Sequence, residues 1–244
     1  MNFKDSALKR SLKLLFKPAD QQCVLLEPHL GLGDSLINIG LVRALSHRHP
    51  KKKFYYAVRF NYFHSIAWMF QDLFNVFPLA IAGEREARQF ASFLNIDYWP
   101  IGIDNVDIEK FDESFYRQHQ VSFEERWSNC FVAPGPLAEI IYQQLNPKDE
   151  PYILLCTTDS AGIRYELQWN NPRGLKVIEV YPASNNIYDW TKLVFKASQI
   201  HTIDTAFIHL VENILSKDTD KQLYFHRARK SATEFSRRLP WVVY

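Results

Sequence analysis

Cysteine is scarce in this 244-residue sequence, and its placement excludes two kinds of site. The three cysteines, Cys23, Cys130 and Cys156, are odd in number and far apart, and no CxxC pair occurs. A disulfide framework or a zinc site is therefore not expected. Cys23 and Cys156 lie in apolar runs of strand length, where cysteine usually acts as a small buried hydrophobic residue. This usage indicates a reducing, cytoplasmic setting.

Long apolar runs and a strong net charge are also lacking. No run approaches the roughly 20 residues of a membrane-spanning helix. A formal net charge of +2 is too small to indicate nucleic-acid binding, and no nucleic-acid partner is expected. Basic residues gather in 1–17 and again in 226–238. We interpret both stretches as amphipathic helices with a solvated face; the alternative is peripheral contact of either one with the inner face of a membrane.

What the sequence has is a hydrophobic fraction of 47% and an aromatic fraction of 15%, enough for a substantial core. Short apolar runs alternate with helical patterns, which predicts an α/β fold of βαβ units with parallel sheets. Strands are predicted at 21–28, 53–60, 78–83, 97–102, 152–158, 175–182, 199–204 and 223–226, and the longer helices at 34–50, 62–74, 84–95, 187–198 and 205–216.

Two segments interrupt this alternation. Residues 111–131 are interpreted as two short helices, with Asp112 and Ser122 as candidate N-caps. The stretch that begins with Pro134-Gly-Pro is the most linker-like part of the chain. We therefore predict two Rossmann-like βαβ domains that face a central cleft, over 1–134 and 151–244, with a linker at 135–150.

The turn "PHLGLGDSL" follows the first predicted strand, where ligands gather in parallel sheets. It lacks the third glycine of a dinucleotide fingerprint, because Leu36 stands there, and it lacks the lysine of a P-loop. Gly31 and Gly33 permit close approach of a ligand to the backbone. Asp34 suits either an N-cap or a general base at a helix start, and the turn alone leaves both interpretations open.

Two loops of the second half suit an anion. "IDTAFIH" places Asp204 and Thr205 at a helix start with His209 in its first turns, a pattern that also fits a capped helix with a packed histidine. After the strand at 152–158, "TTDSAGIR" offers hydroxyls, a glycine and a forked cation. The candidate residues in this loop are Thr157, Thr158, Ser160 and Arg164.

"GLGDSLINIGLVRALSHRHP" and "ASQIHTIDTAFIHLVENI" resemble, in this order, the start and the Asp-[Ser/Thr]-Gly-x-x-His motif of GT-B glycosyltransferases of the bacterial heptosyltransferase type. Ala206 stands where that motif has glycine. The resemblance implies a GT-B fold and transfer of a sugar from a nucleotide-sugar co-substrate to a hydroxyl of a glycan or glycolipid, without a metal or other cofactor. Asp218 and Asp220 form an Asp-x-Asp pair, which we interpret as a solvated loop.

The resemblance also assigns roles to residues. Asp34 is the expected general base. The acceptor side of the site is assigned to His29, Gly31, Gly33 and Arg59, and the donor side to Thr157, Thr158, Ser160, Arg164, Asp204, Thr205 and His209. The alternatives are a non-catalytic module that binds a nucleotide or nucleotide sugar, and a basic surface-binding protein.

Overall fold

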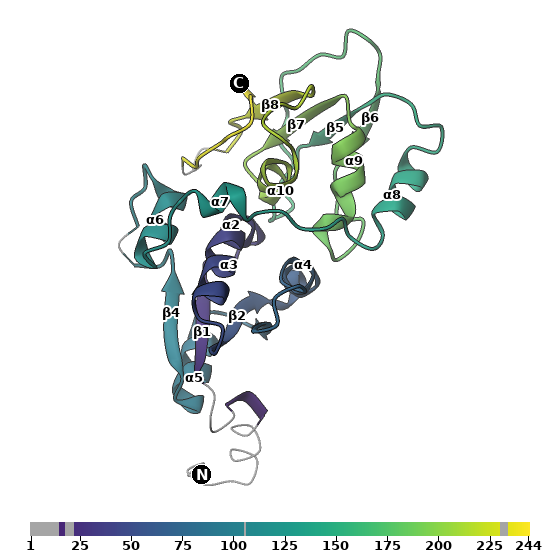
Figure 1. The fold of residues 1–244 in the computed structure, drawn as a ribbon. Helices are drawn as coiled ribbons and strands as arrows, with labels where there is room; N and C mark the ends of the chain where they lie inside the picture. The colour runs from purple at the N-terminus through teal and green to yellow at the C-terminus, as the bar shows by residue number, and fades with distance from the viewer. Residues whose placement is uncertain (1–14, 18–21, 105, 230–233) are drawn as a thin grey trace.

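Two parallel β-sheets, one in each half of the chain, organise the molecule (Figure 1). The computed structural model describes residues 15–17, 22–104, 106–229 and 234–244. The first sheet has the order β3-β2-β1-β4 and the second the order β6-β5-β7-β8-β9. The first contains β1 (Cys23–Pro28), β2 (Lys53–Arg59), β3 (Val76–Ile81) and β4 (Asp97–Ile101). The second contains β5 (Tyr152–Cys156), β6 (Lys176–Glu179), β7 (Gln199–Ile203), β8 (Gln222–His226) and β9 (Val242–Val243). The predicted α/β class with parallel sheets is confirmed.

The helix predicted over 34–50 begins earlier and is broken. Its two parts are α2 (Leu32–Ile37) and α3 (Ile39–Arg48), which meet at Asn38. The carbonyl of Ile37 accepts bonds from the Tyr116 hydroxyl and from Arg126, so distant side chains take over an acceptor that a continuous helix would use. The other first-half helices are α4 (Phe63–Met69) and α5 (Glu84–Leu94), with a 3₁₀ turn η2 (Phe60–Tyr62) between β2 and α4.

The segment 111–131 forms α6 (Phe111–Gln118) and α7 (Glu125–Ser128), as predicted. The hydroxyl of Ser122 accepts a 3.3 Å bond from the N–H of Glu124 at the start of α7, but neither Asp112 nor Ser122 occupies an N-cap position. Lys110 and Glu124 stand at those positions. Asp112 lies inside α6, where its buried carboxylate is 3.6 Å from Nε of Arg126 and accepts bonds from Ser236 of the C-terminal segment. Tertiary partners therefore hold this carboxylate, and it is not available as a local cap.

The second half carries α8 (Ala138–Leu145), η3 (Ile187–Trp190), α9 (Thr191–Lys196) and α10 (Ala206–Ile214). Helix α8 lies within the stretch that the sequence assigns to a linker, and it buries Ala138, Ile141 and Tyr142. The domain limits at 134 and 151 remain a prediction.

The C-terminal tail does not form the predicted helix in residues 227–229 and 234–244. It runs back across the second sheet, buries Phe235 and Leu239, and ends in β9, parallel to β8. The helix predicted for 1–17 falls almost entirely outside the described residues. None of the described helices has the length and apolar character required to cross a bilayer.

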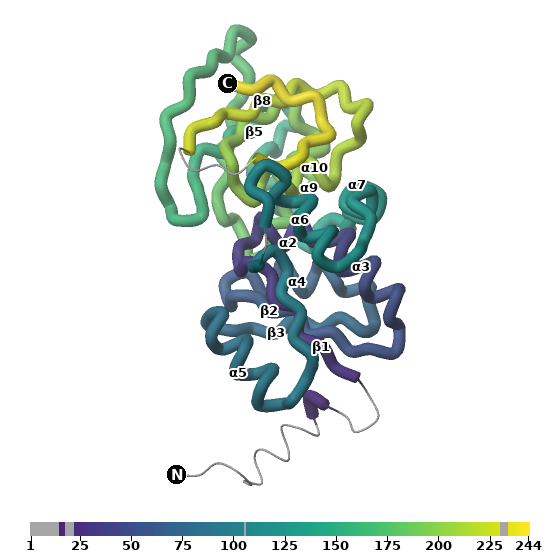
Figure 2. Tube along the Cα trace, turned by 90° about the vertical axis from the view of Figure 1, so that its left-hand side faces the viewer, coloured from purple at the N-terminus to yellow at the C-terminus, as the bar shows by residue number. Residues whose placement is uncertain are grey.

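The two halves are packed against each other, with α2, α7 and α10 at the junction (Figures 1 and 2). One cluster of buried hydrophobic side chains extends through both halves and includes Leu36 of α2, Tyr116 of α6 and Phe207 of α10. Beside it, Asn213 of α10 donates a 2.9 Å bond to the carbonyl of Leu36. The junction is therefore an extension of the core, and it brings the turn after β1 to the start of α10.

Candidate functional site

Each sheet has a point where the strand order reverses, and such points are where open α/β sheets bind ligands. In the first sheet β2 and β4 flank β1 on opposite sides; in the second, β6 and β7 flank β5. The turn at 29–34 follows β1, at the reversal point of the first sheet. The loops at 157–164 and 204–205 follow β5 and β7, at the reversal point of the second sheet. The sheet topology thus selects the same loops as the sequence patterns.

In the turn after β1, the carboxylate of Asp34 folds back over the backbone of the turn. Gly31 occupies the N-cap of α2 with φ −79° and no side-chain cap, and Asp34 lies in the first turn of the helix. The N-cap interpretation of Asp34 is therefore wrong. A Cβ on Gly31 would lie 2.5 Å from Oδ2 of Asp34, so only glycine leaves room for this carboxylate to fold over the turn. The absence of a side chain at Gly31 shapes the position of Asp34.

The environment of Asp34 makes it a weak acid. Burial, with a smaller contribution from the nearby Asp204 carboxylate, raises the pKa of this carboxyl to about 6, although His29 and a backbone hydrogen bond oppose the shift. His29 itself is held by its Nε2, which lies 2.5 Å from the carbonyl oxygen of Gly102 after β4. The structure thus brings together His29 and Asp34 of the first half with Asp204 of the second.

Gly33 packs on the second half. A Cβ at this position would lie 3.2 Å from Cδ2 of His209 and 3.6 Å from Cα of Ala206. The expectation was that both glycines admit the acceptor, but the space beside Gly33 is filled by α10. Gly33 therefore acts as a contact point between the Gly-Asp turn and the helix of the candidate donor motif.

The loop after β7 is capped as the sequence suggests. Thr205 occupies the N-cap of α10 and its hydroxyl accepts a 3.2 Å bond from the N–H of Phe207. Sγ of Cys156, the last residue of β5, lies 3.7 Å from the same hydroxyl. Burial raises the pKa of Asp204, with Arg229 and Arg237 opposing the rise. The Asp204 carboxyl therefore sits, partly buried, where the ends of β5 and β7 meet.

His209 is a packed residue. Its side chain is buried, its ring lies 4.6 Å from that of Phe235, and its Nδ1 has no hydrogen-bond partner among the described residues. Burial lowers the pKa of this imidazole well below its usual value, and the Arg126 charge lowers it further. His209 is therefore neutral at physiological pH, which fits the packed-histidine interpretation of the sequence.

The candidate donor-side residues in the loop after β5 differ in their exposure to solvent. Thr157 is buried at the strand end, whereas Thr158 and Ser160 are exposed. Arg164 forms a 2.6 Å ion pair with Glu179 at the end of the edge strand β6, and both side chains are more than half exposed. The cation expected to face a phosphate is thus engaged by a carboxylate in this structure. Arg59, at the end of β2, is exposed.

Two arginines near the candidate site were not among the predicted site residues. Arg126 is fully buried and donates to the carbonyls of Leu36 and Ile37 and to Oδ1 of Asn213, so it ties α2 to α10. Arg229 donates a 2.9 Å bond to the carbonyl of Asp204. Both contacts join segments far apart in sequence, which a local pattern does not encode.

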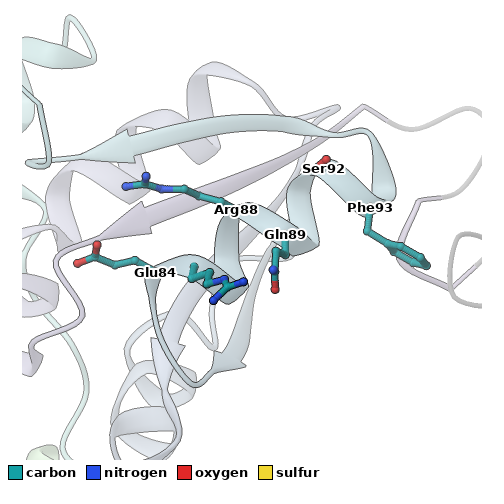
Figure 3. Close-up of a pocket in the computed structure, with 6 residues that line it drawn as sticks. Glu84, Arg88, Gln89, Ser92 and Phe93 are labelled. Atoms are coloured by element: carbon teal, nitrogen blue, oxygen red, sulfur yellow. The ribbon is translucent and has the colours of Figure 1, made fainter. Parts of the chain in front are cut away.

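A surface hollow of about 560 Å³ lies elsewhere, along the outer face of α5 (Figure 3). It is lined by Glu84, Arg85, Arg88, Gln89, Ser92 and Phe93. All of these residues come from one helix and none belongs to the loops at the strand ends, so the hollow does not define the candidate site. Among its lining residues, Arg88 reaches the first sheet, where its Nε lies 3.9 Å from the buried carboxylate of Glu27 in β1.

The described residues contain no group of three or more histidine, cysteine, aspartate or glutamate side chains arranged to hold a metal ion. Asp218 and Asp220 are both exposed in the turn after α10, as expected for a solvated loop.

Comparison with solved structures establishes the fold. The chain superposes on the structure of E. coli ADP-heptose LPS heptosyltransferase II with a TM-score of 0.63 at 10% identity, covering 92% of this chain and 90% of that one. It matches a family 9 glycosyl transferase from Veillonella parvula with a TM-score of 0.56 at 10% identity, over 92% and 86% of the two chains. The chain has the GT-B fold. No protein-family model and no curated protein matches the sequence.

Proposed function

We propose that this protein is a glycosyltransferase that moves a sugar from a nucleotide-sugar donor to a hydroxyl group of a glycan or glycolipid acceptor. The observation that carries the proposal is the position of Asp34. A carboxyl group with a pKa near 6 sits at a strand end of one sheet and faces the Asp204 loop of the other. In a GT-B fold, this is the arrangement that a base on one side and a donor site on the other require.

Sugar transfer requires the protein to deprotonate the acceptor hydroxyl and to stabilise the leaving diphosphate. Asp34 accepts the proton of the acceptor hydroxyl as its oxygen attacks the anomeric carbon, and the bond from that carbon to the diphosphate breaks. The diphosphate leaves with negative charge, which backbone N–H groups at the start of α10 and nearby cations stabilise. These groups supply the stabilisation that a metal would provide in other enzymes, so we propose transfer without a metal.

The similar proteins support the donor class. The E. coli protein is an ADP-heptose heptosyltransferase, and its fold covers most of this chain. A nucleoside-diphosphate sugar is therefore the donor that we propose here. On this assignment, Thr157, Thr158 and Ser160 with Asp204 and Thr205 form the donor side, and His29 and Arg59 lie on the acceptor side.

One observation favours a second candidate, a nucleotide-binding module without transferase activity. Ala206 replaces the glycine of the family motif, and a Cβ added at Gly33 would lie 3.6 Å from its Cα. This contact narrows the space between the two halves. The basic surface-binding alternative has less support, because Arg238 donates to carbonyls of α10 and its end, and Arg227 pairs with Glu234.

A ligand screen followed by a transfer assay tests the proposal. Nucleoside diphosphates and nucleotide sugars are added to the full chain and its melting temperature is recorded. A ligand at a hundred times its Kd adds about 2.7 kcal/mol to the free energy of unfolding. The transferase predicts stabilisation by a nucleotide sugar and transfer or slow hydrolysis that persists in EDTA. Stabilisation without any turnover would favour the module, and stabilisation by no nucleotide would contradict both.

A further inference from the structure

The C-terminal segment returns over the two loops assigned to the donor. We infer that Arg229 binds the diphosphate of the donor, because its guanidinium lies across the loops that follow β5 and β7, between the carbonyl of Asp204 and the carboxylate of Asp159. This inference rests on the proposed function. It assigns the phosphate-binding cation to the C-terminal segment, whereas the sequence pattern points to Arg164.

The geometry places Arg229 at the carboxyl ends of β5 and β7 in the second sheet. Its Nη1 donates a 2.9 Å bond to the carbonyl of Asp204, in the loop after β7. Its Nε lies 4.0 Å from Oδ2 of Asp159, in the loop after β5. Because β5 and β7 are neighbours at the point where the strand order reverses, a side chain that touches both loops stands where a ligand is expected to bind.

Asp159 does not use the hydrogen-bond donors of the Arg229 guanidinium, because its own oxygens are bonded elsewhere. Its Oδ1 accepts bonds from the N–H groups of Ala161 and Ile163, and its Oδ2 accepts from the hydroxyl of Tyr165. These bonds shape the loop and leave only the 4.0 Å contact for Arg229. A guanidinium has five N–H donors; among the described residues the carbonyl of Asp204 accepts from one of them, and the hydroxyl of Tyr165 is a second partner of this side chain. The remaining donors are available to phosphate oxygens.

The local charge requires a cation here. Asp159 and Asp204 lie on either side of Arg229, and a diphosphate placed between two carboxylates would be repelled by both. The side chain of Arg229 is only 34% exposed, so its charge is screened less than that of Arg164, which is 64% exposed and paired with Glu179. The fork of a guanidinium also matches two phosphate oxygens at once, which adds geometric selection to the charge.

The same segment offers a matched control. Arg227 lies two residues from Arg229 and forms a 2.9 Å ion pair with Glu234, in which both side chains are about half exposed. Removal of Arg227 eliminates the same charge from the same segment without touching either donor loop. An effect of general basicity would appear in both variants, whereas direct phosphate binding would appear only at Arg229.

The experiment is calorimetric titration of ADP, UDP, GDP and CDP, and of the matching nucleosides, into wild type, Arg229→Ala, Arg229→Lys and Arg227→Ala. For the diphosphate that binds wild type best, we expect Arg229→Ala to weaken affinity by about tenfold or more. Arg229→Lys should weaken it about threefold or more, because lysine keeps the charge but loses the fork. Arg227→Ala should stay within about twofold, and nucleoside affinity should not change.

The outcomes separate the two levels of the account. Wild-type binding of a diphosphate with unchanged affinity in Arg229→Ala overturns this inference and leaves the proposed function standing. Equal losses in Arg229→Ala and Arg227→Ala overturn it as well, since they indicate a general charge effect. No diphosphate binding by wild type overturns the proposed function and the inference together. If Arg229→Ala does not fold, the lysine variant decides, and wild-type affinity in that variant overturns the inference.

Discussion

Gly33 of the first half lies close to His209 of the second half: a Cβ added to the glycine would lie 3.2 Å from Cδ2 of the imidazole. This relationship joins the two motifs that the sequence shows 170 or more positions apart. It places the helix that carries Asp34 against the helix that follows Asp204. The candidate site therefore lies where one half packs on the other, and we expect it to depend on that junction.

A larger side chain at Gly33 should open the junction. Gly33→Val forces its side chain into His209 and Ala206, and we expect a loss of about 1–3 kcal/mol in the free energy of unfolding from overpacking. The control is Gly83→Val, because a Cβ at Gly83 meets nothing within 4 Å and the backbone there is extended. Chemical denaturation of both variants measures the difference. Equal stability in the two variants would show that the Gly33 contact is not tight.

The buried arginine at the same junction should be essential for stability. Arg126→Ala leaves the carboxylate of Asp112 buried without its cation, and such a loss typically costs about 3–5 kcal/mol. Arg117→Ala is the control, since Arg117 is exposed on α6 and bonds to Ser114. The double variant Arg126→Met with Asp112→Leu should recover part of the stability, because it removes both charges. A small effect of Arg126→Ala in urea denaturation would contradict this account.

Asp34→Asn should stabilise the folded protein at neutral and higher pH. The pKa of Asp34 is raised to about 6 in the folded state, so the folded protein holds the proton more tightly than the unfolded chain does. The contribution of this group to stability is full below pH about 4 and is lost as pH rises to about 6. Asparagine does not titrate, so the advantage of Asp34→Asn should grow between pH 4 and 6 and then remain constant.

The size of that advantage should be on the order of 1–3 kcal/mol, since one pKa unit corresponds to about 1.4 kcal/mol. Unfolding of both proteins at pH 4, 6 and 8 measures it. If Asp34→Asn is less stable than wild type at pH 8, the ionised carboxylate stabilises the fold and the burial argument is wrong.

The pH dependence of the transfer rate should follow the ionisation of Asp34. A general base must be ionised, so kcat/KM should fall about tenfold per pH unit below a midpoint near 6. The residual kcat/KM of Asp34→Asn should not fall with pH in this range. A wild-type profile that is flat from pH 5 to 8 would exclude Asp34 as the titrating base.

Sequence patterns located the loops of the site because local chemistry determines them. An apolar strand followed by Gly-x-Gly-Asp, and a second followed by Asp-Thr, each mark a strand end, and parallel sheets bring strand ends to one edge. The cap at Thr205 follows from the same local rules. The GT-B fold, which the resemblance of these two motifs implied, is confirmed by the comparison with solved structures, whereas the roles of the individual residues remain proposals.

Long-range contacts could not be predicted in the same way. The break at Asn38 depends on Tyr116 and Arg126, which lie 79 and 89 positions from the carbonyl of Ile37 that they bind. Arg164 pairs with Glu179 because β6 lies beside β5 in the sheet, which the spacing of the two residues does not reveal. The tail was predicted as a solvated helix because its charge pattern is amphipathic, but Phe235 and Leu239 find burial against the second half.

The most direct test of the account compares sugar transfer by Asp34→Asn with that by wild type, at saturating donor and pH 8. The substitution preserves the size of the side chain and removes its ability to accept a proton. It also removes a negative charge near the donor side, so nucleotide affinity should stay unchanged or increase. We predict a fall in turnover of about 10²–10⁴-fold with intact fold and donor binding. Turnover within a few-fold of wild type would contradict the assignment of Asp34 as the catalytic base.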